Sequence, residues 1–189
     1  MTESISNLPE RIFLCGFMGS GKSTIGRQLA DELEQPFRDL DSYIEEQAGK
    51  SIPDIFRQEG EKHFRDLERR CLLKTVRSCS GVISLGGGAL QNQQIVDHLK
   101  LKGLLIFIKT PFSIIFQRIE EDKNRPMLWN EQGQAGASEQ LERDLRELYE
   151  QRLPLYRQAE ITIETGPHDT VGEIVDLMIN KIRNHVSYR

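Results

Sequence analysis

The sequence lacks the features that would point to a membrane protein or a nucleic-acid-binding protein. No apolar run approaches the ~18 residues that can span a bilayer. The net charge of −4 leaves no basic excess for binding nucleic-acid phosphates. The first residues, MTESISNLPER, lack the charged and apolar regions of a signal peptide. We therefore expect a cytoplasmic protein with neither a membrane nor a nucleic acid as partner.

Disulfide and zinc patterns are also missing. The three cysteines are odd in number and form no CxxC pair, and the four histidines are scattered without zinc-ligand spacing. We therefore expect reduced thiols. With 189 residues, of which 38% are hydrophobic and 29% charged, the chain is typical of one globular domain. We expect that domain to cover 1–189, with its core at about 11–183.

Short apolar runs alternate with longer helical patterns. Strands are predicted at 11–15, 37–40, 82–85, 104–108 and 161–164. Helices are predicted at 22–33, 42–48, 61–79, 92–102, 112–122 and 171–183, and Gly49 is expected to close the second of them. Ser51 followed by Asp54 predicts a capping box for a further short helix, and Pro154 is expected to end the helix before it. This alternation predicts an α/β fold, with a parallel sheet covered by helices on both faces.

The clearest motif is GFMGSGKS at 16–23, which matches GxxxxGK[ST] between a predicted strand and a predicted helix. Its glycines allow the backbone to wrap around phosphates, so that N–H groups and the helix N-terminus face the anion. Lys22 is expected to reach the β- and γ-phosphates, and the Ser23 hydroxyl to bind Mg²⁺. The predicted ATP-binding residues of this loop are Gly19, Ser20, Gly21, Lys22, Ser23 and Thr24.

The carboxylate expected for the metal is missing from its usual place. In many P-loop proteins a later strand ends in an aspartate that helps to hold Mg²⁺, but the strand at 82–85 ends in three glycines, 86–88. Asp39 and Asp41 follow the second strand instead, and a period of two places both carboxylates on one side of an extended segment. Asp39 is predicted to bind Mg²⁺ through a water and Asp41 to face the acceptor. The alternative is that Asp41 or Ser42 only caps the next helix.

Arg65 has a glutamate on either side of it on the same helix face. Glu61 lies four residues before it and Glu68 three residues after it. The pattern is compatible with a solvated ion-pair ladder of little stabilising value. It is also compatible with an arginine that Glu68 orients at the rim of a pocket, where its planar fork suits a carboxylate. Phe56 and Phe64 mark neighbouring apolar surface and favour the second interpretation.

One polar stretch, NRPMLWNEQGQAGAS at about 124–138, interrupts the alternation of strands and helices. It is too long for an ordinary connection, and loops of this length in compact domains are commonly active-site lids or disordered segments. Arg125 at its base favours a lid over a floppy surface loop. Arg118 and Arg125 flank the approach to it. We therefore predict a lid at about 124–138.

Together these motifs resemble the shikimate kinases, small P-loop kinases of the aromatic amino-acid pathway. The resemblance runs from about Arg11 to Lys181. The matching pieces are GFMGSGKSTIGRQLA (16–30), DLD (39–41), SIPDIF (51–56), GEKHFRDLE (60–68), SLGGGA (84–89), RPML (125–128) and RLPLY (152–156). It implies a nucleoside-monophosphate-kinase-like fold with five parallel strands, an acceptor-binding region at about 39–68 and a mobile lid. It also implies a monomer that transfers the γ-phosphoryl group of ATP to the 3-hydroxyl of shikimate, giving shikimate 3-phosphate and ADP in chorismate biosynthesis.

The resemblance also implies roles for matching residues. Arg65 and Arg152 bind the carboxylate of shikimate, and Asp41 binds its ring hydroxyls and accepts a proton. The glycines that line the ring, where the backbone can approach closely and offer N–H donors, are Gly86, Gly87 and Gly88. Arg125 reaches the transferring phosphate from the lid, and Arg118 lies against adenine. The implied catalytic residues are therefore Lys22, Asp41 and Arg125, while contacts from Trp129 to Ser138 match nothing residue by residue.

Two other functions fit parts of the pattern. Another small-molecule kinase of this architecture, acting on gluconate or a nucleoside monophosphate, accounts for the P-loop and the lid. It leaves the glycine triplet and the Arg65–Arg152 pair without a joint purpose. A regulatory module that binds a nucleotide without chemistry predicts a broken acceptor site, whereas every matched residue is present.

Overall fold

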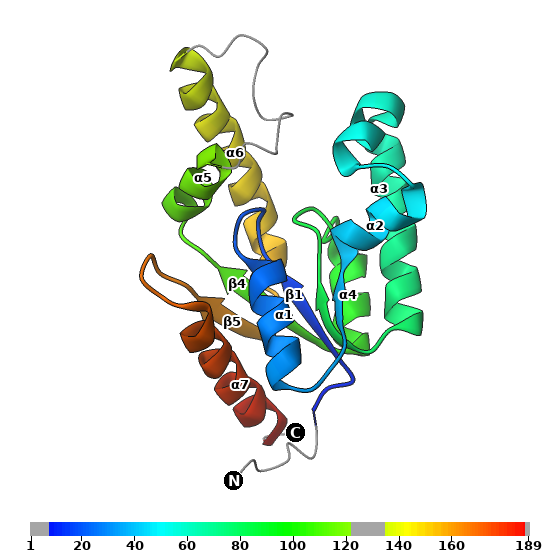
Figure 1. Ribbon diagram of the computed structural model, residues 1–189, viewed down its shortest axis with the longest axis vertical. Helices are drawn as coiled ribbons and strands as arrows, with labels where there is room; N and C mark the ends of the chain where they lie inside the picture. Colours follow the sequence, from blue (N-terminus) through cyan, green and yellow to red (C-terminus); the bar gives the residue numbers. More distant parts are fainter. Residues whose placement is uncertain (1–7, 122–134, 188–189) are drawn as a thin grey trace.

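The computed structural model describes residues 8–121 and 135–187, and these contain a five-stranded sheet. Its strands are β1 (Arg11–Cys15), β2 (Phe37–Asp39), β3 (Gly81–Ser84), β4 (Leu104–Lys109) and β5 (Ile161–Glu164). They lie in the order β2-β3-β1-β4-β5, and every pairing is parallel. The predicted five-stranded parallel sheet is confirmed, with β1 at its centre (Figure 1).

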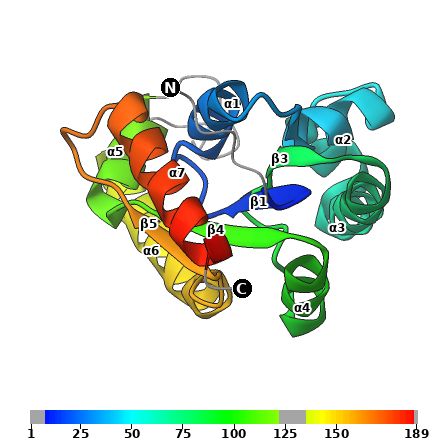
Figure 2. The same cartoon turned by 90° about the horizontal axis from the view of Figure 1, so that it is seen from below.

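Helices cover both faces of this sheet, as predicted (Figure 2). They are α1 (Lys22–Glu32), α2 (Leu40–Ala48), α3 (Ile52–Ser78), α4 (Gln93–Lys102), α5 (Phe112–Glu121), α6 (Ala135–Tyr156) and α7 (Val171–Ser187). On β1, Ile12 and Leu14 pack with α1 and α7, whereas Phe13 and Cys15 face the cluster formed with α3, α4 and α6. Burial on both faces explains why the strands read as continuous apolar runs.

Local capping signals set several helix ends where the sequence predicted them. Gly49 ends α2 with a φ of 66°, a left-handed conformation that favours glycine. The Ser51 hydroxyl accepts from the N–H of Asp54 and opens α3. α3 then continues through Gly60, whose φ of 81° and ψ of 170° produce a kink at the start of the helix predicted from 61. α2 and the kinked α3 therefore form a bent unit beside the sheet (Figure 1).

The prediction that Pro154 ends a helix is wrong. α6 continues through Pro154 to Tyr156, and it begins at Ala135, inside the predicted lid. Residues 135–138 of that stretch are therefore helical, and the role of 124–138 as a lid stays a prediction. Strong helix formers such as Glu, Gln, Leu and Arg fill α6. The remainder of the predicted lid, with Arg125 and Trp129, lies outside the described residues.

The sequence predicted reduced thiols and no apolar run long enough to span a membrane. Cys15, Cys71 and Cys79 are all free thiols. Burial raises the pKa of the Cys15 thiol well above its usual value, which keeps it protonated and unreactive. Within 8–121 and 135–187, no helix combines the length and the hydropathy needed to cross a bilayer.

Candidate active site

The P-loop between β1 and α1 owes its shape to glycine. Gly16, Gly19 and Gly21 have φ values of 146°, 76° and 90°, which other residues rarely adopt. A Cβ on Gly16 would also lie 2.7 Å from the carbonyl oxygen of Ile108. These glycines fold the loop tightly over the end of the sheet, so the motif predicted from the sequence has the expected geometry.

The N-terminus of α1 faces the space inside this loop. Gly21 is the N-cap and supplies no side-chain cap, so the first N–H groups of the helix are available to an anion. Lys22 begins the helix, is 7% exposed, and donates from Nζ to the carbonyl oxygen of Phe17 at 2.8 Å. A phosphate oxygen in the loop can replace that carbonyl as acceptor. This end of the pocket therefore has the composition of an anion-binding site.

Oxygen donors for a metal meet beside α1. The Ser23 hydroxyl donates to Oδ2 of Asp39 at 2.5 Å, and the hydroxyl of Ser84, at the end of β3, lies 3.4 Å from that of Ser23. Among the described residues no three His, Cys, Asp or Glu side chains form a metal-binding group. Mg²⁺ needs no such cage, because it usually keeps several waters and binds substrate phosphates as well. The residues present therefore fit Mg²⁺ bound together with a nucleotide. The sequence analysis did not identify Ser84 as a member of this group.

The prediction that Asp39 and Asp41 share one extended segment is wrong. β2 ends at Asp39 and α2 begins at Leu40, so Asp41 lies in the first turn of a helix. Asp39 caps that helix by accepting from the N–H of Ser42 at 3.1 Å, so the cap is neither Asp41 nor Ser42. Because the helix follows the strand directly, both carboxylates still reach the same edge of the sheet. Asp39 contacts Ser23 and Asp41 lines the pocket.

Further residues reach the pocket from the ends of β4 and β5. Arg118 of α5 donates from Nη1 to the carbonyl oxygen of Gly19 at 3.1 Å, which holds it against the P-loop. Thr165 and Asp169, which follow β5, line the same pocket, and the Thr165 hydroxyl lies 2.8 Å from that of Thr110. The sequence analysis identified Arg118 but missed Thr165 and Asp169. The rule that ligands bind beyond the carboxyl ends of parallel strands is the signal that identifies them.

Arg65 is held at the rim of the pocket by a buried carboxylate. Its Nη1 donates to Oε2 of Glu68 at 2.7 Å, and Glu68 is only 1% exposed. Gln91, which the sequence analysis missed, donates to the same oxygen at 3.0 Å. Glu61, by contrast, lies 3.5 Å from Arg65 Nε with a side chain that is 70% exposed. Only the pair of Glu61 with Arg65 is therefore a solvated ion pair, whereas the buried Glu68 orients the Arg65 guanidinium.

The glycine triplet after β3 passes very close to these side chains. A Cβ on Gly86 would lie 2.5 Å from Oδ1 of Asp41 and 2.9 Å from Oε1 of Glu68. A Cβ on Gly88 would lie 2.4 Å from Nη1 of Arg65. Neither glycine has a left-handed φ, so space and not backbone conformation excludes a side chain here. The sequence predicted that the absence of side chains leaves room for a ligand ring. The structure shows in addition that charged side chains of the chain itself lie too close to Gly86 and Gly88 for a Cβ to fit.

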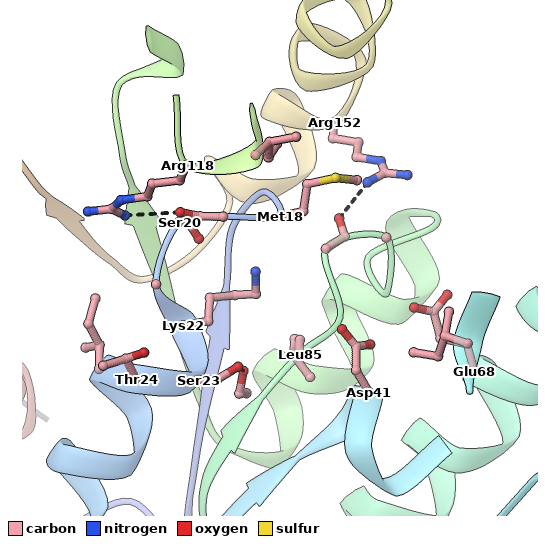
Figure 3. Close-up of a pocket in the computed structure, with 18 of the residues that line it drawn as sticks. Met18, Ser20, Lys22, Ser23, Thr24, Asp41, Glu68, Leu85, Arg118 and Arg152 are labelled. Carbon is pink, nitrogen blue, oxygen red and sulfur yellow. Dashed lines mark hydrogen bonds between the residues drawn. The ribbon is translucent and has the colours of Figure 1, made fainter. Parts of the chain in front are cut away.

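Arg152 reaches the middle of the triplet from α6. Its Nη1 donates to the carbonyl oxygen of Gly87 at 3.0 Å, and its guanidinium carbon lies 5.7 Å from the centre of the buried Phe17 ring. A Cβ on Gly87 would lie 3.0 Å from the backbone nitrogen of Met18 in the P-loop. The triplet is therefore packed between the P-loop and α6, and Arg152 lies above it (Figure 3).

A pocket of about 790 Å³ joins the two groups of residues. Lys22 and Ser23 line one part of it, and Asp41, Arg65 and Arg152 line the other. Figure 3 labels all of these except Arg65. Two predicted site residues do not line the pocket. Asp39 contacts Ser23 instead, and Gly86 lies against Asp41. Arg125 lies outside the described residues. The pocket is lined by four cations, Lys22, Arg65, Arg118 and Arg152, and by four carboxylates, Asp41, Glu45, Glu68 and Asp169, so an anionic ligand group can bind at the cations and a hydroxyl at a carboxylate.

Comparisons with known proteins agree on one family. The shikimate kinase family model matches residues 18–183. The shikimate kinase of Chlorobium phaeobacteroides (strain BS1) is 42% identical over 178 residues, which cover 94% of this chain and 89% of that protein. The solved structure of shikimate kinase from Acinetobacter baumannii in complex with shikimate has a TM-score of 0.82 and 36% identity, and covers 100% of this chain and 99% of its own. A gluconokinase from Sinorhizobium meliloti 1021 has a TM-score of 0.59 at 16% identity, covers 96% of each chain, and is similar in fold alone.

Proposed function

The chain belongs to the shikimate kinase family, and we propose that the pocket joining the P-loop to Arg65 and Arg152 is its active site. The protein is an ATP-dependent kinase that phosphorylates shikimate at its 3-hydroxyl. In this reaction the bond from the γ-phosphorus to the oxygen of the ADP leaving group breaks. A bond from phosphorus to the 3-oxygen of shikimate forms, and the hydroxyl proton is released. The proposals below assign these events to residues.

The P-loop holds the phosphates of ATP in this proposal. The backbone N–H groups from Gly19 to Thr24 surround the phosphate chain, and Lys22 turns from the Phe17 carbonyl to the β- and γ-phosphates. Because the transition state for phosphoryl transfer is loose, positioning and neutralisation of charge on the phosphoryl oxygens dominate catalysis. Arg118, already held by the Gly19 carbonyl, lies against the adenine ring.

Ser23 and Asp39 hold Mg²⁺ in this proposal, the serine directly and the aspartate through a water. When bound, the ion neutralises charge on the phosphate oxygens. The 2.5 Å contact between the two side chains supports the assignment, because it orients both oxygen atoms beside the phosphate site. Asp39 also caps α2, so its carboxylate is held in place independently of any ligand.

The acceptor binds between Asp41 and the two arginines. Arg65 and Arg152 bind the carboxylate of shikimate, because a guanidinium pairs with a carboxylate through two parallel hydrogen bonds. Asp41 accepts the 3-hydroxyl proton and aligns the oxygen for attack. Gly86, Gly87 and Gly88 let the backbone run beside the ring.

The lid assignments rest on the family resemblance. We assign Arg125 to the transferring phosphoryl group, where its charge adds to that of Lys22 in the transition state. Closure of the lid excludes water and so suppresses ATP hydrolysis. The monomeric state and the cytoplasmic location are proposed on the same basis.

One observation carries the site assignment: the P-loop lysine, Asp41 and the two arginines all line the same pocket. Gluconate also carries a carboxylate, so the arginine pair alone does not separate the two acceptors. The family model over residues 18–183 and the 42% identity to a shikimate kinase favour shikimate, because the gluconokinase is only 16% identical. A regulatory module has no use for Asp41.

The test is release of ADP from MgATP in a coupled assay. Shikimate, gluconate, AMP and no acceptor are run in parallel on the same enzyme preparation. We expect release with shikimate and only background release in the other three. Release with gluconate or AMP but not shikimate would remove the roles given to Asp41, Arg65 and Arg152. Binding of ATP without release in any reaction would favour the regulatory module.

A further inference from the structure

The carbonyl oxygen of Gly87 accepts two hydrogen bonds from one helix. Arg152 donates from Nη1 at 3.0 Å, and the hydroxyl of Tyr156 donates at 2.5 Å. The two donors are four residues apart on α6, so they lie on the same helix face. A carbonyl oxygen has two lone pairs, and both are occupied here. This peptide group is therefore held from the α6 side at both acceptor positions.

Tyr156 has no role in the proposed phosphoryl transfer, yet its polar atom is directed at the site. The residue is 1% exposed, and its ring stacks on Phe107 of β4 at a centroid distance of 5.3 Å. Burial raises the pKa of the phenol well above its ordinary value, so the hydroxyl stays protonated and able to donate. Phenylalanine would fill the same apolar space, and a buried hydroxyl is unfavourable unless it is hydrogen-bonded. Packing alone therefore does not account for tyrosine at this position.

The orientation of the peptide group between Gly87 and Gly88 matters because the group is planar. In a trans peptide the C=O and the N–H point in opposite directions. Since the Gly87 carbonyl faces α6, the N–H of Gly88 faces away from α6. Arg152 lies on one side of this loop and Asp41 on the other (Figure 3). The observed orientation therefore directs the Gly88 N–H toward the side of the pocket where the acceptor hydroxyls bind in the proposed function.

Two consecutive glycines make this orientation easy to lose. Rotating the peptide group by half a turn changes ψ of Gly87 and φ of Gly88, and glycine populates positive and negative φ about equally readily. The backbone alone therefore does not select one orientation. Arg152 is an unreliable restraint during turnover, because its guanidinium also has to pair with the ligand carboxylate. The phenol of Tyr156 is buried and faces no ligand.

We propose that Tyr156 is a positioning residue for the acceptor: its hydroxyl fixes the Gly87–Gly88 peptide group so that the Gly88 N–H donates to a ring hydroxyl of shikimate. The inference rests on the proposed location of the acceptor site. It assigns a binding role to the last residue of RLPLY, whose first residue, Arg152, contacts the same carbonyl.

The test is Tyr156→Phe, which removes one oxygen atom and keeps the ring. We expect KM for shikimate to rise about tenfold, which is the effect of losing one net hydrogen bond. KM for ATP should stay unchanged. A loss of folded enzyme lowers kcat in proportion to the active fraction and moves neither KM, so the separation of the two KM values distinguishes positioning from a structural role.

Tyr149→Phe is the matched control. Tyr149 lies on the same helix, packs on Phe17 with a ring distance of 5.4 Å, and makes no hydrogen bond from its hydroxyl to another described residue. Loss of the Tyr149 hydroxyl should leave KM for shikimate and KM for ATP unchanged. An equal rise in KM for shikimate in both variants would overturn the proposal, as would an unchanged KM in Tyr156→Phe. Inactivity of the wild-type enzyme with shikimate would instead contradict the proposed function itself.

A second measurement compares the backbone of the wild-type protein with that of Tyr156→Phe. In the wild-type protein the backbone amide of Gly88 should show no microsecond-to-millisecond exchange by NMR relaxation dispersion before shikimate is added, because the carbonyl on the other side is fixed. Exchange between two states at that amide in the free enzyme would contradict the proposal. Exchange that appears only in Tyr156→Phe would support it.

Discussion

On the proposed ATP side of the pocket, the phosphate-binding groups come from one continuous stretch of chain, 16–24, whereas the proposed shikimate side collects residues from α2, α3, the loop after β3, and α6. On the first side the ligand groups are mostly backbone N–H groups, shaped by glycines with positive φ. On the second they are side chains held by other side chains, such as Arg65 by the buried Glu68.

This difference has a consequence for substitutions. A backbone-built phosphate site depends on local conformation, so changes elsewhere in the pocket should leave ATP affinity intact. A site built from side chains depends on each supporting contact, so even an added methyl group should weaken shikimate binding. The following substitutions test whether the two sides are separable in this way.

The largest effect is expected for Asp41→Asn. Asparagine keeps the size and loses the proton acceptor, so kcat should fall by about 10² to 10⁴, the usual contribution of a general base. ATP affinity, measured by calorimetric titration, should be unchanged because Asp41 lies on the acceptor side. Asp66→Asn, an exposed position on α3, is the control. Near-normal turnover would rule out the base role, and weaker ATP binding would show that the two sides are coupled.

A smaller but still large effect is expected for Gly88→Ala. The new methyl group would lie 2.4 Å from Nη1 of Arg65, so the guanidinium has to move. Misplacing a binding group by about 1 Å costs about 10²-fold in rate, and we expect a loss of this size in kcat/KM for shikimate. Gly172→Ala is the matched control, since a Cβ there meets no atom closer than 3.7 Å. Steady-state kinetics at saturating ATP measure both. Equal kinetics in the two variants would mean that Arg65 does not bind the acceptor.

Glu68→Gln should have a moderate effect. Glutamine retains an acceptor for Arg65 but loses the charge, and charge-assisted hydrogen bonds are roughly twice as strong as neutral ones. KM for shikimate should rise about tenfold, with KM for ATP unchanged. Glu61→Gln removes the other, exposed partner of Arg65 and should change little, because exposed ion pairs contribute about 0–1 kcal/mol. If the Glu61 variant shows the larger effect, Glu68 is not the residue that orients Arg65.

The smallest effect on catalysis is expected for Gly26→Ala in α1. A Cβ there would lie 2.9 Å from both the Leu14 and the Phe37 side chains, so the added methyl group overpacks the core behind the P-loop. The free energy of unfolding should fall by about 1–3 kcal/mol, as measured by urea denaturation. Both KM values should stay unchanged, because the loop's own φ angles are untouched. A raised KM for ATP would show that packing behind α1, as well as the glycines, sets the phosphate site.

The amino-acid sequence by itself determined the fold class and the ATP side. The strand–helix alternation, the GxxxxGK[ST] motif and the Ser51 and Gly49 caps all appear in the structure where they were predicted. Each of these features depends on residues that are close in the sequence. The features are the regular spacing of apolar residues along a helix or strand, a hydroxyl that accepts from an N–H three residues later, and a glycine with a positive φ. Such interactions can be read from a short stretch of sequence because the chain brings the partners together whatever the rest of the fold does.

Only the tertiary structure decided the acceptor side. The spacing of DLD suggested an extended pair, but α2 begins directly after β2 and places Asp41 in a helix. The spacing of Arg65 and Glu68 did not reveal which glutamate is buried, because Glu68 is covered by Gly86 and Gln91 from the loop after β3. The contacts of Arg152 and Tyr156 with Gly87 join residues 65 and 69 positions apart. No local pattern specifies such pairs, since they form only once α6 packs against the end of the sheet.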